Sequence, residues 1–345
     1  MASEPFFDPV VIEQIDKLIA DCGGNPDTFD RELVSQMIQT SLKLLFEGHD
    51  TGQLKLMSRA LREMRYAYRV FNQYGKKARR LTIFGSARTP ETHPDYLTCS
   101  MLGQLAVEKG WMVMTGGANG IMKAGLEGAG KANSFGLSIR LPFEMEPNII
   151  IDGDNKSIMF RYFFTRKLMM VSHADALVAF PGGLGTQDEL FEVLTLMQTG
   201  KSHIVPVVLL EGGNSAYWKE WESFAHTELL DKGWISPDDL NLYHIATSPQ
   251  EALDHILHFY SNYHSSRYVK DQLVLRLQRT PSPATMEALN HEFQDLLVSG
   301  TLLLSSALPE ENGEAEGLPR LVLHHNRRHI GKVRKLIDRI NDART

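Results

Sequence analysis

Five short apolar runs, separated by segments of helix length, constrain the fold of this chain more than any other feature of its sequence. The runs span residues 81–84, 111–114, 135–139, 176–180 and 204–210. Most of them lack polar alternation, as expected for strands that are covered on both faces. Their alternation with helical segments predicts an α/β fold with a doubly wound, parallel, Rossmann-like sheet. Ligands of such sheets bind beyond the carboxyl ends of the strands.

The segments on either side of this pattern predict two further domains. Residues 1–78 carry apolar positions at helical spacing and predict a helical N-terminal extension, which precedes the central domain at 79–263. The tail, 264–345, predicts a small α+β appendage, in which residues 269–277 alternate like one strand. A basic run at 76–80 is expected to be a solvated linker.

Charge and cysteine content bound the class of protein. The formal net charge of −6 gives no support for nucleic-acid binding, which usually needs a basic footprint. The basic residues between 327 and 335 either bind an anionic regulator or, as we favour, form a solvated face. Cys22 and Cys99 stand in no metal-like spacing and fit a reducing compartment. Without a signal-peptide pattern at residues 1–8 or a run of roughly 18 apolar residues, we expect a cytoplasmic protein that does not span a membrane.

Three of the predicted strands are followed immediately by a glycine-rich loop. The three loops read FGSAR at 84–88, TGGANG at 115–120 and PGGLGTQDE at 181–189. Glycine lets backbone amides approach a phosphate closely, and the helix that follows points its partial positive charge at the anion. The loops therefore predict a small ligand that bears a phosphate. The candidate binding residues are Gly85, Ser86, Gly116, Gly117, Gly182, Gly183, Gly185 and Thr186.

The absence of other motifs narrows the chemistry. No loop spells G-x-G-x-x-G with an acidic residue about 20 positions later, so the dinucleotide fingerprint is not met. The run Gly200-Lys201-Ser202 lacks the upstream glycine of a P-loop, because Thr195 stands there. Neither H-E-x-x-H nor C-x-x-C occurs. We therefore expect no metal and no cofactor.

The third loop allows two interpretations of Glu189. In one, Thr186 caps a helix and Glu189 reaches back to it as a capping box. In the other, which we favour, the loop amides hold a phosphate while Glu189, in the first turn of the helix, faces the sugar. Arg166 and Lys167 precede the strand before this loop. The intervening helix and strand return the chain to the same end of the sheet, so Arg166 and Glu189 are expected to meet there.

These motifs carry a specific resemblance. The pair Arg166-Lys167 followed by PGGLGTQDE at 181–189 resembles the signature of the LOG (Lonely Guy) family of phosphoribohydrolases, PGGxGTxxE with an upstream arginine–lysine pair. Gly85-Ser86 and the turn at 115–122 resemble that family's first two loops. The resemblance covers the central domain and not its flanks.

The resemblance implies hydrolysis of AMP-like nucleotides or cytokinin riboside monophosphates without a metal, with Arg166 and Glu189 as the catalytic pair and Lys167 at the substrate. It also implies a homodimer or larger assembly. A carboxylate suits this reaction, because breaking an N-glycosidic bond develops oxocarbenium character at the sugar. The length of the chain makes it more similar to long bacterial nucleotide nucleosidases. Members are often labelled lysine decarboxylases, but no residue here marks a lysine for a pyridoxal phosphate Schiff base. The alternative is a carrier or sensor of the same fold, such as a molybdenum cofactor carrier, which binds a ligand without turnover.

Overall fold

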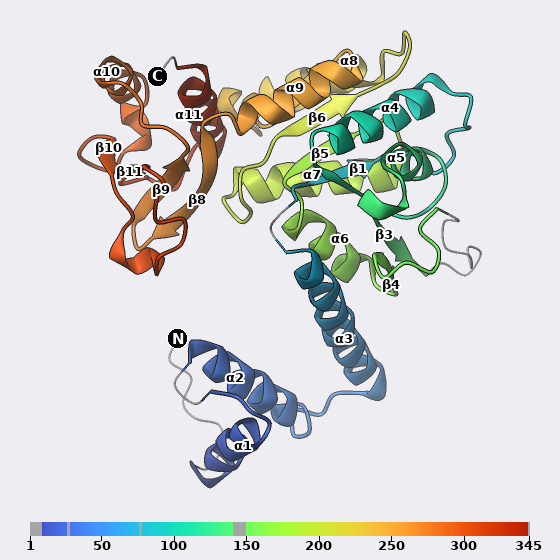
Figure 1. Ribbon diagram of the computed structural model, residues 1–345, viewed down its shortest axis with the longest axis vertical. Helices are drawn as coiled ribbons and strands as arrows, with labels where there is room; N and C mark the ends of the chain where they lie inside the picture. The colour runs from blue at the N-terminus through green and yellow to red at the C-terminus, as the bar shows by residue number, and fades with distance from the viewer. Residues whose placement is uncertain (1–8, 26–27, 76–77, 141–149, 344–345) are drawn as a thin grey trace. The chain divides into compact units, whose positions relative to one another are not determined.

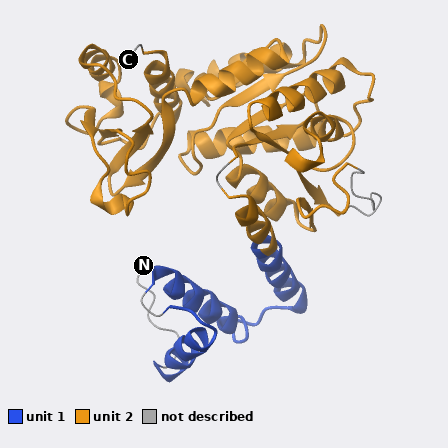
Figure 2. Cartoon of the chain, in the orientation of Figure 1, with its two compact units in different colours: residues 1–65 blue, residues 66–345 orange. Residues whose placement is uncertain are grey.

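The computed structural model of this chain (Figure 1) divides into two compact units, residues 1–65 and 66–345 (Figure 2). The structure describes residues 9–25, 28–75, 78–140 and 150–343. The boundary between the units falls inside helix α3, Thr51–Tyr74. The expected domain boundaries near 79 and 264 stay a prediction. Residues 1–8, on which the absence of a signal peptide was judged, lie outside the described residues, as do Lys76 and Lys77 of the basic run.

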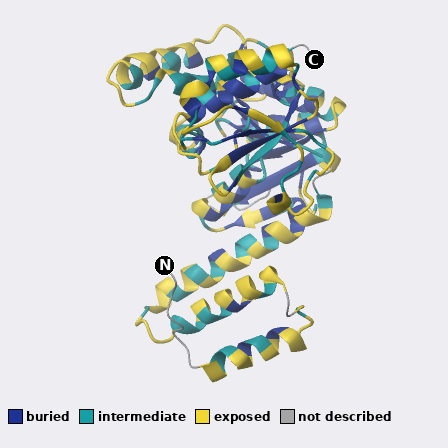
Figure 3. Ribbon diagram, turned by 90° about the vertical axis from the view of Figure 1, so that its left-hand side faces the viewer, coloured by how far each residue is buried: buried dark blue, intermediate teal, exposed yellow. Residues whose placement is uncertain are grey.

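The first unit consists of helices, as its periodicity predicts. It contains α1, Pro9–Asp21, α2, Phe29–Lys43, and the first part of α3. Thr28 caps α2, since its side chain accepts a hydrogen bond from the amide of Arg31 at 3.3 Å. Most side chains of these helices are exposed or half-buried, as Figure 3 shows.

The second unit is built on a seven-stranded parallel sheet in the order β4-β3-β2-β1-β5-β6-β7, which confirms the predicted doubly wound fold. The strands are β1 Arg80–Phe84, β2 Met112–Thr115, β3 Ser134–Ile139, β4 Ser157–Phe160, β5 Ala176–Ala179, β6 Val207–Leu210 and β7 His244–Ala246. The five apolar runs became β1, β2, β3, β5 and β6. The edge strands β4 and β7 were not predicted, because they are only partly buried and so lack a continuous apolar run.

Helices cover the sheet on both faces. They are α4 Pro94–Glu108, α5 Ile121–Ala129, α6 Phe163–Ser172, α7 Leu184–Gln198, α8 Tyr217–Phe224 and α9 Pro249–Phe259. On one face, α4, α5 and α9 pack with alternate strand residues, such as Leu81 and Ile83, into one apolar core. Thr82 points to the other face, where its hydroxyl donates to the carbonyl of Met170 in α6. This two-sided cover explains why the central strands are mostly apolar and show no regular polar alternation.

The C-terminal part forms an antiparallel sheet of its own, in the order β10-β11-β9-β8. Its elements are β8 Tyr263–Val269, β9 Gln272–Leu277, α10 Pro283–Glu292, β10 Leu303–Ser305, β11 Arg320–Leu323 and α11 Ile330–Asp342. The prediction of one strand at 269–277 is wrong, because the chain reverses at Lys270, which has a φ of 55°, and β8 pairs with β9.

Two basic segments are solvated only in part, although the sequence suggested solvated surfaces. Arg80 opens β1, is buried and donates to the carbonyl of Gly75 at 2.6 Å. Arg79 stacks 3.3 Å above the ring of Tyr260. In the tail, Arg327, Arg328 and Lys335 are exposed, whereas Arg334 is buried. Basic residues of α11 pair with carboxylates of the same unit. These pairs are Lys332–Asp295, Lys335–Glu292 and Arg334–Asp338. Within the described ranges, no helix has the length and apolar character that crossing a membrane requires.

Candidate functional site

The three glycine-rich loops meet at the carboxyl edge of the parallel sheet, as predicted. They follow β1, β2 and β5, and β1 lies between the other two strands. Backbone hydrogen bonds join the loops: the amide of Ser86 donates to the carbonyl of Pro181 at 3.2 Å, and the amide of Ile121 donates to the carbonyl of Ser86 at 3.0 Å. The order of strands reverses between β1 and β5, which is the place where doubly wound sheets bind ligands.

The second loop needs its glycines for close approach. Gly117 has a φ of 66°, and a Cβ there would overlap the hydroxyl of Ser138. Its amide donates to the hydroxyl of Thr115 at 3.1 Å, so that N–H group is already engaged. At Gly116, a Cβ would lie 2.6 Å from Nη2 of Arg166. A glycine at this position therefore leaves room for the guanidinium of Arg166.

The third loop forms the N-terminus of α7, and its geometry rules out the capping-box interpretation. Helix α7 begins at Leu184 with Gly183 as its N-cap, and no side chain caps it. Thr186 is consequently the third helical residue, buried against Gly182. Glu189 lies in the second turn, which corrects the expected first turn. Amides of the first turn have no partner within a helix. A Cβ at Gly183 would contact nothing within 4 Å, so there is open space beside this amide.

Arg166 and Glu189 meet across α6 and α7, as the sequence predicts, while their catalytic roles stay a prediction. Nη2 of Arg166 lies 3.5 Å from Oε1 of Glu189. The side chains are 10% and 16% exposed, respectively. Nε of Arg166 is buried, and it has no hydrogen-bond partner within the part of the chain that the structure describes. A buried guanidinium with an unused donor is well suited to hold an anionic or polar ligand atom.

Burial changes the acidity of both groups. It raises the pKa of Glu189 to about 7, although the neighbouring Arg166 and Lys167 favour the charged carboxylate. Burial also lowers the pKa of Arg166, against the effect of Glu189. Arginine nevertheless remains cationic near neutral pH. A carboxyl group with a pKa near 7 can exchange a proton at physiological pH, as a general base must.

Lys167 is engaged with carboxylates of α7. Its ammonium lies 2.5 Å from Asp188 and 2.6 Å from Glu192. The structure therefore presents Lys167 as a link between α6 and α7. Its expected contact with substrate stays a prediction.

No metal-binding cluster accompanies this site. Among the described residues, no group of three or more histidine, cysteine, aspartate and glutamate side chains is arranged to hold a metal ion. The neighbouring His324 and His325 take separate partners: Nε2 of His324 lies 3.3 Å from Asp271, and the hydroxyl of Tyr268 lies 2.6 Å from Nδ1 of His325.

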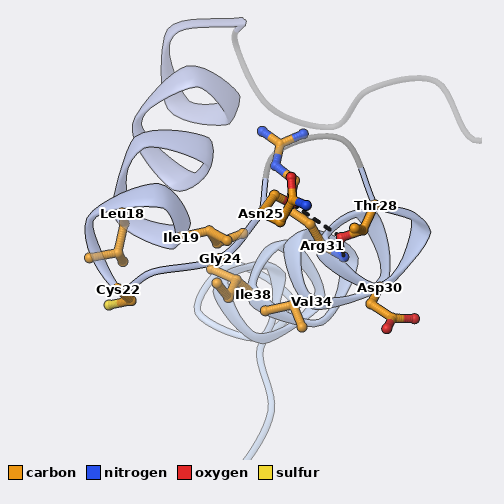
Figure 4. Close-up of a pocket in the computed structure, with 10 residues that line it drawn as sticks. All are labelled: Leu18, Ile19, Cys22, Gly24, Asn25, Thr28, Asp30, Arg31, Val34 and Ile38. Atoms are coloured by element: carbon orange, nitrogen blue, oxygen red, sulfur yellow. Dashed lines mark hydrogen bonds between the residues drawn. The ribbon is translucent and has the colours of Figure 1, made fainter.

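A separate pocket of about 460 Å³ lies between α1 and α2 in the first unit, and Figure 4 shows its lining. The lining residues are Leu18, Ile19, Cys22, Gly24, Asn25, Thr28, Asp30, Arg31, Val34 and Ile38. None of the glycine-rich loops contributes to it. The convergence of loops, helix N-terminus and perturbed carboxyl identifies the sheet edge, and not this pocket, as the candidate site.

No sequence signal indicated that residues of α8 contact the third loop. Tyr217 donates to the carbonyl of Gly182 at 2.6 Å, and Gln187 and Trp221 extend this contact. Tyr217 follows β6, whose end carries no motif that resembles the three phosphate-type loops.

Comparisons with known proteins find relatives that match part of this chain. The family model described as "Possible lysine decarboxylase" matches residues 114–256. Cytokinin riboside 5′-monophosphate phosphoribohydrolases of Mycobacterium marinum and Mycobacterium tuberculosis are 27% and 26% identical over 46% and 47% of this chain, and over 83% and 86% of their own length. A phosphoribohydrolase of the same name from Arabidopsis thaliana is 40% identical over 25% of this chain and 38% of its own length. These findings confirm the predicted resemblance of the central domain to the LOG family.

Solved structures that match part of this chain include the molybdenum cofactor binding protein of Rippkaea orientalis. It is 24% identical, covers 53% of this chain and 98% of its own chain, and has a TM-score of 0.38. The molybdenum cofactor carrier protein of Chlamydomonas reinhardtii is 24% identical, covers 52% and 97%, and has the same score.

Proposed function

We propose that this chain, whose central domain is similar to the LOG family, hydrolyses the N-glycosidic bond of nucleoside 5′-monophosphates to a free base and ribose 5-phosphate. The observation that carries this proposal is the pair of Arg166 and Glu189, 3.5 Å apart, with a carboxyl pKa of about 7. The relatives named as phosphoribohydrolases support this reaction class at the level of the family.

The proposed mechanism uses groups of this chain alone. The phosphate binds at the first-turn amides of α7, where the helix dipole favours an anion. Deprotonated Glu189 orients a water molecule and accepts its proton while the water oxygen bonds to C1′ of the ribose. The C1′–N bond breaks, and the base leaves with the electron pair and takes up a proton from solvent. Glu189 then releases its proton to solvent, which restores the carboxylate. Arg166 anchors the nucleotide beside Glu189.

The acidity of Glu189 gives this mechanism a pH signature. Only the deprotonated carboxylate accepts a proton, so we expect kcat/KM to fall as the pH decreases below about 7. A profile without such a limb would remove Glu189 from the role of base.

The decisive experiment incubates the full chain, without added metal, with AMP, GMP, CMP, UMP and isopentenyladenosine monophosphate, and measures the free base by chromatography. We expect release from at least one nucleotide, slower by about a hundredfold or more in Glu189→Gln. Glu287→Gln, at an exposed position of α10, is the matched control and should retain full activity.

Two results would contradict this proposal. If no nucleotide releases its base while nucleotide binding persists, the chain is a carrier or sensor and the hydrolase proposal is wrong. Equal turnover by wild type and Glu189→Gln would instead refute the assigned residue. We also predict that the chain assembles into a homodimer or larger oligomer. Light scattering of the protein as it elutes from a size-exclusion column tests this prediction.

A further inference from the structure

We infer that Tyr217 is a positioning residue, which fixes the peptide between Gly182 and Gly183 so that the Gly183 N–H points at the phosphate of the substrate. The inference rests on the proposed function only for the identity of the ligand. In physical terms, the side chain of Tyr217 in α8 determines how tightly the third glycine-rich loop binds an anion.

The hydroxyl of Tyr217 belongs to a chain of three side-chain hydrogen bonds. Nε1 of Trp221 lies 3.0 Å from Oε1 of Gln187, and Nε2 of Gln187 lies 2.7 Å from the hydroxyl of Tyr217. The hydroxyl lies 2.6 Å from the carbonyl oxygen of Gly182. Tyr217 and Trp221 are four residues apart on α8, so they share one face of that helix.

The direction of each bond in this chain is determined. An indole N–H can only donate, so the oxygen of the Gln187 amide must face Trp221 and its NH₂ group must face Tyr217. The Tyr217 oxygen therefore accepts from Gln187. Its single proton remains for the carbonyl of Gly182, which can only accept.

This contact determines where the next amide points. A peptide group is planar and trans, so the C=O of Gly182 and the N–H of Gly183 point in opposite directions. With the carbonyl held toward α8, the N–H of Gly183 points away from α8. Gly183 is the N-cap of α7, and a Cβ there would contact nothing within 4 Å.

Two glycines in succession make such a restraint necessary. Glycine residues tolerate many φ and ψ values, so the peptide between them can turn over at little steric cost. A turned peptide would direct the carbonyl oxygen of Gly182, instead of an N–H, toward the anion. Tyr217 favours the orientation that binds the phosphate.

The test measures Tyr217→Phe, which removes one hydroxyl. We expect the dissociation constant for ribose 5-phosphate to rise about tenfold, the scale of one lost hydrogen bond. The KM for nucleotide should rise by a similar factor while kcat stays within about twofold of wild type, because Arg166 and Glu189 are untouched. Tyr268→Phe is the control: this half-buried tyrosine on β8 bonds to His325 and should leave both constants unchanged.

A second variant keeps the test valid if Tyr217→Phe does not fold. In Gln187→Glu, the carboxylate accepts from both Trp221 and Tyr217, which takes the hydroxyl proton away from Gly182. Affinity for ribose 5-phosphate should fall and stay low in about 0.5 M salt, where simple charge repulsion is screened.

The outcomes separate this inference from the proposed function. Unchanged ribose 5-phosphate affinity in Tyr217→Phe overturns the positioning role, whatever the enzyme hydrolyses. A fall in kcat without a change in affinity also overturns it. If wild type binds ribose 5-phosphate about tenfold more tightly than the variant but hydrolyses no nucleotide, the positioning role holds and the hydrolase proposal fails.

Discussion

Glu189→Gln should change how the stability of the second unit depends on pH. Burial raises the pKa of Glu189 from an ordinary value of 4.5 to about 7, whereas glutamine does not titrate. The difference in unfolding free energy between wild type and variant therefore isolates the ionisation of this one carboxyl group. Any constant effect of the substitution cancels when two pH values are compared.

The sign and size follow from the two pKa values. Between pH 4.5 and 7 the folded protein retains a proton that the unfolded chain has lost, so the wild type loses stability relative to the variant as the pH rises. At about 1.4 kcal/mol per pH unit, the interval corresponds to a relative loss of about 3 kcal/mol. The loss should be complete above about pH 8 and absent near pH 4.

Urea unfolding followed by tryptophan fluorescence measures this difference at each pH. All four tryptophans, Trp111, Trp218, Trp221 and Trp234, lie in the second unit, so the signal reports on the unit that contains Glu189. A wild type that gains stability relative to the variant as the pH rises would mean that Arg166 outweighs burial and lowers the pKa. A flat difference would mean that folding leaves the carboxyl unperturbed, and either result would refute the argument.

Three further substitutions test the packing of the unit. Gly116→Ala would place a methyl group 2.5 Å from Sδ of Met122 and 2.6 Å from Nη2 of Arg166, and both side chains would have to move. We expect turnover to fall by about a hundredfold as the guanidinium is displaced. Circular dichroism should show a retained fold, as also for Gly183→Ala, whose Cβ meets open space. Glu311→Gln would leave the fully buried Arg320 without its carboxylate partner, and urea unfolding should show a loss of about 3–5 kcal/mol. A loss below about 1 kcal/mol would mean that carbonyl groups alone satisfy Arg320.

The sequence predicts the parallel sheet because strands that are buried on both faces appear in it as short apolar runs. The residues of β5, at 176–179, are all buried and all apolar, and a run as short as this is typical of a strand rather than of a helix. The edge strand β7 has partly exposed residues and so no continuous apolar run. The hairpin at Lys270 was missed for a different reason. Its left-handed residue is Lys270 and not a glycine, so the sequence carries no turn signal at that position.

The features of the candidate site also differ in how far the sequence predicts them. Those that the backbone conformation requires are predicted, whereas those that a distant side chain provides are not. Gly117 must be glycine, because its φ is positive and a Cβ has no room. A loop of this kind can therefore be recognised in the sequence. A hydrogen bond to the carbonyl of Gly182 imposes no such requirement. Any hydroxyl or amide donor at the right place would serve, from any element at that edge of the sheet, so nothing around Tyr217 marks its role. The glycine-rich motif thus predicts that amides are available but not how they are aimed. Two chains with the same PGGLG loop should differ in phosphate affinity according to what lies behind that carbonyl.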